Sequence, residues 1–469
     1  MKPSEELTYS AAALLDGAPC TVVLPAGCGK TELVAASSLL AVSRNQRVLV
    51  LTHTHAGVDA LRRRLSRFGV ARSAVRVTTS DSWATNIVRS FPVLAGHDAT
   101  VPMEWSEVHT SCLRALNNPH IAGMVAQSYE YLIVDEYQDC STTQHAIVMA
   151  LSHHISTIIL GDPMQAIYDF SGNELVDWER DLGHLPMVAL DTYPWRWHGY
   201  NEALGEFLVY VRSQLERGDP IDLRGTPALK WCSDLPEPRR KLCYRMARAD
   251  GSVVLLEEWD KQCEKTARSL GGLFGVMEDL EGNNLLSLAR AADVGSPLKR
   301  AVAILDFARA CYANLPTALK SKRDAMDAGS FPGFQQSSRL GPLLSTLRGG
   351  VEEPSPHAVT QSLQSVDALG ATLFRYEAWY EMKRATRIWC EGGSDTLTEA
   401  VRLVRDRVRL LGRPAMGRTV SRPVLVKGLE YDRCVVLGAD RFKREQLYVA
   451  LTRARSQLVV VSAEPVLRP

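Results

Sequence analysis

The chain has 469 residues, of which 46% are hydrophobic and 23% are charged, so it can bury sizeable cores and should divide into roughly two to four domains. Its formal net charge is only +1, which excludes the argument that a globally basic protein binds nucleic acid and leaves room only for local contacts. The ten cysteines include no Cys-x-x-Cys pair, so neither a zinc site nor an iron–sulfur cluster is expected.

The first residues, MKPSEELTYS, carry acidic groups where a secretory signal peptide needs a basic start and an apolar run. The sequence also lacks an apolar stretch of the roughly 18 residues that a membrane helix requires. We therefore expect a cytoplasmic protein with reduced thiols and no membrane contact.

Short β-branched and aliphatic runs alternate with helical patterns in the N-terminal third. These runs are 21–24, 48–52, 75–77, 132–134 and 157–160. They are typical of buried parallel strands flanked by helices, so an α/β domain is predicted over residues 1–186. Between about 84 and 127 the strand pattern fades and prolines appear, which indicates a small insertion.

Strand-like runs return in the rest of the chain but are far apart in sequence. They are 187–190, 253–256, 434–437 and 458–461. We expect them to form a second α/β sheet, in a domain made of residues 187–285 and 399–469. Residues 286–398 have helical character with no obvious strand, are broken by a Gly/Pro/Ser-rich stretch at 329–357, and are predicted to be a helical insertion.

A candidate phosphate-binding loop, LPAGCGKT, occupies residues 24–31 between the first strand and a helix. Glycines let backbone N–H groups turn toward phosphate oxygens, Lys30 would reach the β and γ phosphates, and the Thr31 hydroxyl would bind Mg²⁺. Leu24 departs from the glycine of the full pattern, and a simple helix-capping turn is the alternative. The residues expected to hold the nucleotide here are Gly27, Cys28, Gly29, Lys30, Thr31 and Glu32.

A carboxylate pair, Asp135 and Glu136, follows the apolar strand at 132–134. Asp135 at the strand end would hold Mg²⁺, and Glu136 would polarise the water that attacks the γ-phosphate of ATP. The alternative is a solvated strand end with acidic caps. A second buried strand beside a phosphate loop is where this chemistry needs carboxylates.

Two stretches in this region resemble a known family. DEYQD at 135–139 and GDPMQAIY at 161–168 are similar to motifs II and III of the UvrD, Rep and PcrA helicases of superfamily 1. The resemblance implies that Gln165 senses the γ-phosphate, and that Tyr168 and Phe170 stack on DNA bases, an interaction that tolerates any base sequence. Burial of both aromatic rings in a domain interface is the alternative.

Looser matches follow two other strands. The segment 52–56 resembles the motif whose residues touch the single-strand backbone, which implies DNA contacts for Thr52 and His53. The segment 79–83 resembles the next DNA-contacting motif, which implies a contact for Thr79. Simple capping of the strand ends is the alternative for the histidine.

Three further family motifs have counterparts in the chain, of which the match to motif VI is strong. The segment 192–196 resembles motif IV, which implies that Arg196 contacts phosphate and Trp195 stacks on adenine, although a core tryptophan is the alternative. The segment 426–432 resembles motif V and implies a nucleotide contact for Glu430, but the Thr-x-His usual upstream is absent. The segment 445–454 resembles motif VI and implies that Arg453 is the arginine finger. The family's N-terminal glutamine motif, which reads adenine, is also missing.

The resemblance implies two RecA-like P-loop domains that hydrolyse ATP with Mg²⁺ and move 3′ to 5′ on single-stranded DNA, with RNA as an open alternative. The short insertions resemble compact members such as the helicase subunit of Gabija-type systems. The competing interpretation is an ATPase switch that is regulated by DNA or a partner and does not unwind processively. A protein partner, or self-association, would use the helical insertion.

Overall fold

The structure is a computed structural model that describes residues 3–97, 105–168, 174–278, 283–411 and 417–468. The chain forms two compact units. Unit 1 consists of Met1–Lys230, Phe442–Leu458 and Val466–Pro469, and unit 2 consists of Trp231–Arg441 and Val459–Pro465. Unit 1 thus contains residues 187–230 and 442–458, which the sequence assigned to a second domain; the domain boundaries stay a prediction.

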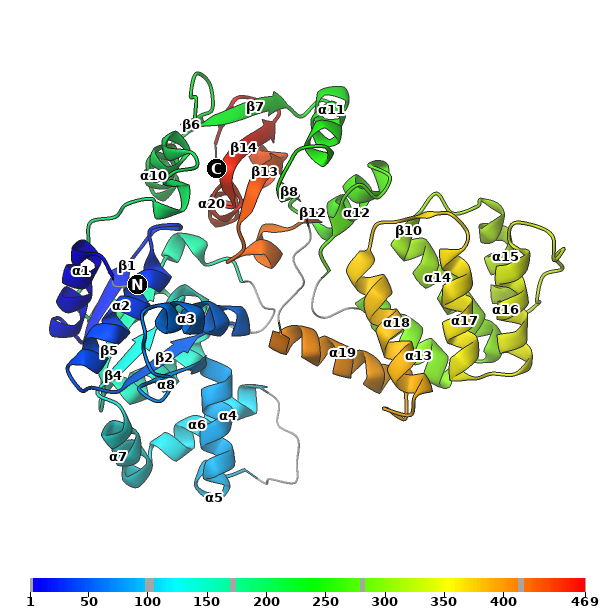
Figure 1. Ribbon diagram of the computed structural model, residues 1–469. Helices are drawn as coiled ribbons and strands as arrows, with labels where there is room; N and C mark the ends of the chain where they lie inside the picture. Colours follow the sequence, from blue (N-terminus) through cyan, green and yellow to red (C-terminus); the bar gives the residue numbers. More distant parts are fainter. Residues whose placement is uncertain (1–2, 98–104, 169–173, 279–282, 412–416, 469) are drawn as a thin grey trace. The chain divides into compact units, whose positions relative to one another are not determined.

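A parallel five-stranded sheet organises unit 1 (Figure 1). Its strands in chain order are β1 (Cys20–Val23), β2 (Val48–Thr52), β3 (Val75–Thr79), β4 (Tyr131–Val134) and β5 (Ser156–Gly161). The spatial order is β1-β5-β4-β2-β3, with Val22 opposite Leu160 and Ile133 opposite Ile158. All five predicted strands are confirmed, and their carboxyl ends meet at one edge of the sheet, where α/β proteins place ligands.

Side chains alternate between the two faces of this sheet, and each face has its own core. One core packs Val50, Ile133 and Ile158 against α1 (Glu5–Asp16), α2 (Lys30–Ser43) and α3 (His55–Arg67). The other core packs the neighbouring residues, such as Leu49, Leu132 and Ile159, against helices of the second face. These helices are α4 (Ser80–Ser90), α5 (Pro92–Ala95), α6 (Trp105–Leu116), α7 (Pro119–Ser128) and α8 (Thr142–Ser152).

The predicted insertion at about 84–127 is therefore helical and is part of this packing. Val108 and Cys112 of α6 and Ile121 and Val125 of α7 belong to the same buried cluster as Leu132 of the central strand β4. Burying these aliphatic side chains removes apolar surface from water, which is the main driving force for such packing. The insertion therefore packs onto α4 and α8, the helices that contact the sheet on this side.

The apolar run at 187–190 does not join the second sheet, so this prediction was wrong. Met187 forms an isolated parallel bridge with Thr21 of β1, and the Val188 N–H donates to the Thr21 carbonyl at 2.9 Å. Val188 and Leu190 pack against the core of the first sheet. An apolar run specifies burial but does not specify which sheet edge buries it.

Unit 1 contains further helices and strands. They are η1 (Tyr137–Asp139), η2 (Pro163–Gln165), α9 (Trp178–Leu182), η3 (Trp195–Trp197), α10 (Glu202–Arg217), β6 (Ile221–Asp222), α20 (Arg444–Leu451) and β15 (Val466–Leu467). β6 and β15 pair antiparallel.

The second sheet has six strands in the order β7-β14-β13-β8-β12-β9. They are β7 (Leu229–Ser233), β8 (Val253–Leu256), β9 (Gly275–Val276), β12 (Arg418–Ser421), β13 (Tyr431–Leu437) and β14 (Ala454–Ser462), accompanied by α11 (Pro236–Ala247), α12 (Asp260–Ser269), η4 (Pro423–Val426) and η5 (Ala439–Arg441). β8 pairs in parallel with β12 and β13. The predicted strands at 253–256, 434–437 and 458–461 are confirmed, and with both sheets the α/β fold class is confirmed.

The helical part of unit 2 has a hydrophobic core of its own. Its helices are α13 (Asn283–Val294), α14 (Pro297–Cys311), α15 (Ala318–Asp327), α16 (Gly341–Glu352), α17 (Pro356–Asp367), α18 (Tyr376–Cys390) and α19 (Leu397–Leu411). The prediction that this part contains no strand was wrong, because two short strands, β10 (Tyr312–Ala313) and β11 (Thr372–Leu373), pair here. The Gly/Pro/Ser-rich stretch contains α16, and Arg348 of this helix lies over the rings of Phe331 and Phe334.

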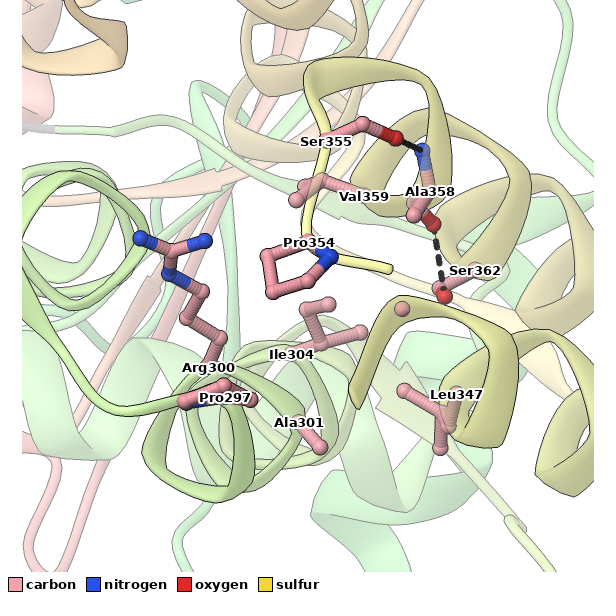
Figure 2. A pocket seen from close by; sticks show the side chains of 11 residues that line it. Pro297, Arg300, Ala301, Ile304, Leu347, Pro354, Ser355, Ala358, Val359 and Ser362 are labelled. Carbon is pink, nitrogen blue, oxygen red and sulfur yellow. Dashed lines mark hydrogen bonds between the residues drawn. The ribbon is translucent and has the colours of Figure 1, made fainter. Parts of the chain in front are cut away.

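Figure 2 shows a small cavity in these helices, lined by residues that include Ile304, Leu347 and Val359. The Ser355 hydroxyl caps α17 by accepting from the Ala358 N–H at 3.2 Å. The volume of about 20 Å³ has room for roughly one water molecule, so the cavity is not a candidate ligand site. Among the described helices, none combines the length and apolar character that crossing a membrane requires.

Candidate functional site

The predicted phosphate loop lies between β1 and α2 at the carboxyl edge of the first sheet. Gly27 and Gly29 have φ angles of +76° and +82°, a left-handed conformation that glycine adopts without strain. A Cβ on Gly27 would lie 2.7 Å from the Trp197 ring. The loop therefore requires glycine both for its backbone turn and for this close approach.

Lys30 begins α2 and is buried close to both predicted carboxylates. Its Nζ lies 3.5 Å from Glu136 Oε1 and has no hydrogen-bond partner within the described structure. Burial by itself would lower the pKa of Lys30, but the charges of Glu136, Asp135 and Asp162 raise it above its ordinary value. Lys30 is thus a buried cation with unused hydrogen-bonding capacity.

The carboxylate pair stands at the end of β4, with β5 between it and the phosphate-loop strand β1. Burial, followed by the charge of Glu136, raises the pKa of Asp135 to about 7. Glu136 has a φ of +57°, which is strained for a non-glycine residue, and its carboxylate accepts from Gln138 Nε2 at 2.5 Å. Asp135 therefore lies where a nearby cation would favour its ionised form.

A chain of hydrogen bonds joins the carboxylates to motif III. Gln138, which donates to Glu136, also accepts from the Asp162 N–H at 2.9 Å through Oε1. The Asp162 carboxylate is fully buried and accepts from Gln165 Nε2 at 2.8 Å. The side chain of Gln165 is thereby oriented by a buried charge.

Asp162 is neutralised by Arg212, a residue of α10. The Arg212 guanidinium donates to Asp162 Oδ1 and lies 3.4 Å from the Tyr448 hydroxyl. Tyr448, in turn, accepts from the Ala26 N–H of the phosphate loop at 3.1 Å. Burial opposes the charge on Arg212, but Asp162 and Tyr448 raise its pKa. Motif III, α10, α20 and the phosphate loop therefore share one buried network.

The motif IV residues also lie against the phosphate loop. The Arg196 N–H donates to the Gly27 carbonyl at 3.1 Å, and its Nη1 donates to the Thr452 carbonyl at 2.8 Å. Trp197 is buried and donates to the Ala454 carbonyl at 2.7 Å. Trp195 is 51% exposed and contacts Tyr193 at a centroid distance of 4.5 Å. Trp197 is therefore the core tryptophan, whereas Trp195 is half exposed beside Gly29 of the phosphate loop.

Three other residues, Arg453, Glu32 and Glu430, are predicted to contact the nucleotide. Arg453 is buried, lies just after α20 and donates to the Val449 carbonyl of that helix at 2.8 Å. Glu32 forms ion pairs with Arg64 and Arg67 of α3, so its carboxylate joins α2 to α3. Glu430 is exposed and belongs to unit 2. The arginine-finger role and the nucleotide role of Glu430 stay predictions.

Of the predicted nucleic-acid residues, two are largely buried. Thr52 ends β2 and is 2% exposed, and Thr79 ends β3 and is 4% exposed. The Thr79 hydroxyl caps α4 by accepting from the Ser82 N–H at 3.1 Å. His53 Nε2 lies 3.3 Å from the Cys140 sulfur, Tyr168 is half-buried, and Phe170 lies outside the described residues. Their contacts with DNA stay predictions.

The residues at this edge fit a nucleotide with a divalent cation. A buried Lys30 ammonium without a hydrogen-bond partner and a glycine-lined turn are suited to phosphate oxygens. The carboxylate of Asp135 and the hydroxyl of Thr31, the second residue of α2, are hard oxygen donors of the kind that Mg²⁺ prefers. Burial raises the pKa of the Cys28 thiol to about 11, so this cysteine is a neutral loop residue.

Known proteins are similar to this chain in the segment that contains the carboxylate pair. The family model of the UvrD/REP helicase N-terminal domain matches residues 96–177, which hold the carboxylate pair and Gln165. This segment of the chain is thus similar to the N-terminal domain of the UvrD/REP helicases.

Two curated proteins resemble this chain over short stretches. The ATP-dependent DNA helicase PcrA of Leuconostoc citreum is 34% identical over 77 residues, which are 16% of this chain and 10% of PcrA. An ATP-dependent helicase/nuclease from Alkaliphilus oremlandii is 29% identical over 68 residues, which are 14% of this chain and 6% of that protein. The aligned parts thus cover a tenth or less of either relative.

A solved structure, the Pif1 helicase from Candida albicans, aligns with 99% of this chain and 95% of its own length. Its TM-score is 0.41 and its sequence identity is 12%. These values are too low to establish a common overall arrangement.

Four residues of the site were assigned no role by the sequence analysis. Gln138, Asp162 and Tyr448 lie inside recognised motifs, so the motifs themselves were a signal that could have found them. Arg212 lies on the amphipathic helix α10 outside every motif, and no local pattern marks it. Its importance follows from its burial against Asp162, since a buried charge needs a partner.

Proposed function

We propose that this chain hydrolyses ATP and uses the free energy to move along single-stranded DNA in the 3′-to-5′ direction. The observation that carries the proposal is the position of Lys30, in a glycine-lined loop and 3.5 Å from Glu136. A buried ammonium, two carboxylates and a buried glutamine at the carboxyl edge of one parallel sheet form the constellation that phosphoryl transfer needs.

Each residue has a distinct task in this proposal. Lys30 and the backbone N–H groups of the loop bind the β and γ phosphates, and Glu136 orients the attacking water and takes its proton. Asp135 and Thr31 would hold Mg²⁺, which supplies charge neutralisation at the transferring phosphoryl group. Gln165, oriented by Asp162, senses the γ-phosphate.

The buried network suggests how binding and hydrolysis of the nucleotide would affect other elements of unit 1. Ala26 in the loop and Gln165 after β5 are linked through Tyr448, Arg212 and Asp162. A change in phosphate contacts at either end would change the hydrogen bonds of α10 and α20. Tyr168 follows Gln165 by three residues, so stacking on a DNA base and sensing of phosphate would share one short segment.

The test is the steady-state ATPase activity of the purified chain with Mg²⁺, measured alone, with single-stranded DNA and with single-stranded RNA. DNA-stimulated hydrolysis, together with displacement of a protein block from the 5′ end of a single strand, is the expected result. Absence of ATP hydrolysis under all conditions would refute the proposal. Stimulated hydrolysis without directional movement would favour the regulated ATPase switch.

A further inference from the structure

The helix α11 of unit 2 presents a basic hollow that lies outside every recognised motif. The hollow has a volume of about 560 Å³, and it is lined by Arg240, Lys241, Tyr244, Arg245 and Arg248. Four of these side chains are cationic and the fifth is aromatic. Because the whole chain has a formal charge of only +1, this is a local concentration of positive charge.

The charges of the hollow are largely uncompensated. Among the residues that the structure describes, Lys241 pairs with Glu237 of the same helix at 2.7 Å, whereas Arg240, Arg245 and Arg248 form no ion pair. The helix dipole favours cations only near the C-terminal end, so it accounts for Arg245 and Arg248 but not for Arg240 in the middle of α11. An anionic ligand would reduce the electrostatic repulsion among these cations.

The opposite face of α11 is fixed to the protein. Leu242, Cys243 and Met246 are buried in the core of the second sheet. Arg239 donates to Asp234 at 2.7 Å and to the buried Glu257 that follows β8. The helix is therefore held in place, and its basic face is turned away from the core.

The spacing along the helix suits an extended ligand. Arg240, Tyr244 and Arg248 are separated by four residues each, which corresponds to roughly 6 Å along the axis for each step. Tyr244 is 38% exposed and offers a ring between two guanidinium groups. Arginine suits phosphate because its planar fork donates two parallel hydrogen bonds.

We propose that this hollow binds the phosphate backbone of single-stranded nucleic acid, with one base stacked on Tyr244. A membrane surface is disfavoured because an interfacial helix must insert an apolar face, and the apolar face of α11 is already buried. An acidic protein is disfavoured because specific protein interfaces have an apolar centre, and the lining of the hollow includes no aliphatic residue. The inference deepens the proposed function by adding a second, motif-independent contact.

The test uses the full chain without nucleotide, so that its outcome does not depend on ATP hydrolysis. Binding of fluorescein-labelled oligothymidylate is measured by anisotropy over a range of salt concentrations, for wild type and for the triple variant Arg240→Ala, Arg245→Ala, Arg248→Ala. The matched control is Arg384→Ala, Arg387→Ala, Arg402→Ala, three exposed arginines of α18 and α19. It removes the same total charge from a different part of unit 2.

We expect the α11 triple variant to bind at least about tenfold more weakly near physiological salt and its log–log salt slope to flatten by about 2, since each lost phosphate contact contributes about −0.7. Tyr244→Ala should weaken binding without changing the slope. The control should match wild type, and the ATPase rate without DNA should be unchanged in every variant.

Three results would overturn the inference. They are equal binding by wild type and the α11 variant, an equal loss in the control variant, or competition by poly-glutamate as effective as competition by unlabelled oligothymidylate. A loss confined to blunt duplex DNA would show that the ligand is not a single strand. If the chain had no ATPase activity but the α11 variant still lost affinity, the proposed function would fail while this inference stood.

Discussion

The buried ion pair between Arg212 and Asp162 allows the sharpest prediction about stability. In Arg212→Met, the Asp162 carboxylate keeps the donors Met164 N–H and Gln165 Nε2 but loses its countercharge. Both side chains are buried, at 9% and 0% exposure. Removing one partner of such a pair costs roughly 3–5 kcal/mol, because the other charge stays buried and uncompensated.

The expected result is a fall in the melting temperature of the transition that includes unit 1. At roughly 2–4 °C per kcal/mol for a unit of this size, the fall should be roughly 6–20 °C by circular dichroism. The control is Arg217→Met on the same helix, whose pair with Asp219 is 57% exposed on the arginine side. An exposed pair contributes only about 0–1 kcal/mol, so this variant should melt close to wild type.

A double-mutant cycle with Asp162→Asn separates the ion pair from simple loss of packing. Neutralising Asp162 removes the uncompensated charge, so the double variant should be more stable than the sum of the two single losses by at least about 1 kcal/mol. The ATPase turnover of Arg212→Met should also fall below that of Arg217→Met, because Asp162 orients Gln165. Additive stability losses, or wild-type melting of Arg212→Met, would refute the reasoning.

Three other predictions test the proposed chemistry and movement. Glu136→Gln should keep ATP binding but abolish turnover, while Lys30→Ala should also weaken binding; near-wild-type turnover of purified Glu136→Gln in a phosphate-release assay would remove the assignment. Tyr168→Ala should weaken single-strand binding by roughly 1–3 kcal/mol, the scale of a lost base stack, and unchanged anisotropy titrations would show that this ring is core. Because the insertions are short, movement on single strands should exceed duplex separation; efficient unwinding of long 3′-tailed duplexes at low protein concentration would contradict this.

Local sequence patterns were sufficient to predict the elements that consist of a buried apolar run between two turns. The strands of the first sheet and the loop at residues 24–31 could be predicted because β-branched runs favour buried strands and because glycine in a loop before a helix is suited to phosphate. The same reasoning placed Asp135 and Glu136 at the carboxyl edge of the sheet, because they directly follow a buried strand.

The tertiary structure decided what depends on contacts between distant segments. The apolar residues at 187–190 could pack beside either sheet. Only the bridge to Thr21 shows which sheet they join. Arg212 resembles any arginine of an amphipathic helix until Asp162, 50 residues away, is seen against it. Tyr448 and Ala26 are 422 residues apart and share a hydrogen bond. Periodicity reports burial along one element, whereas ion pairs and hydrogen bonds require coordinates for both partners.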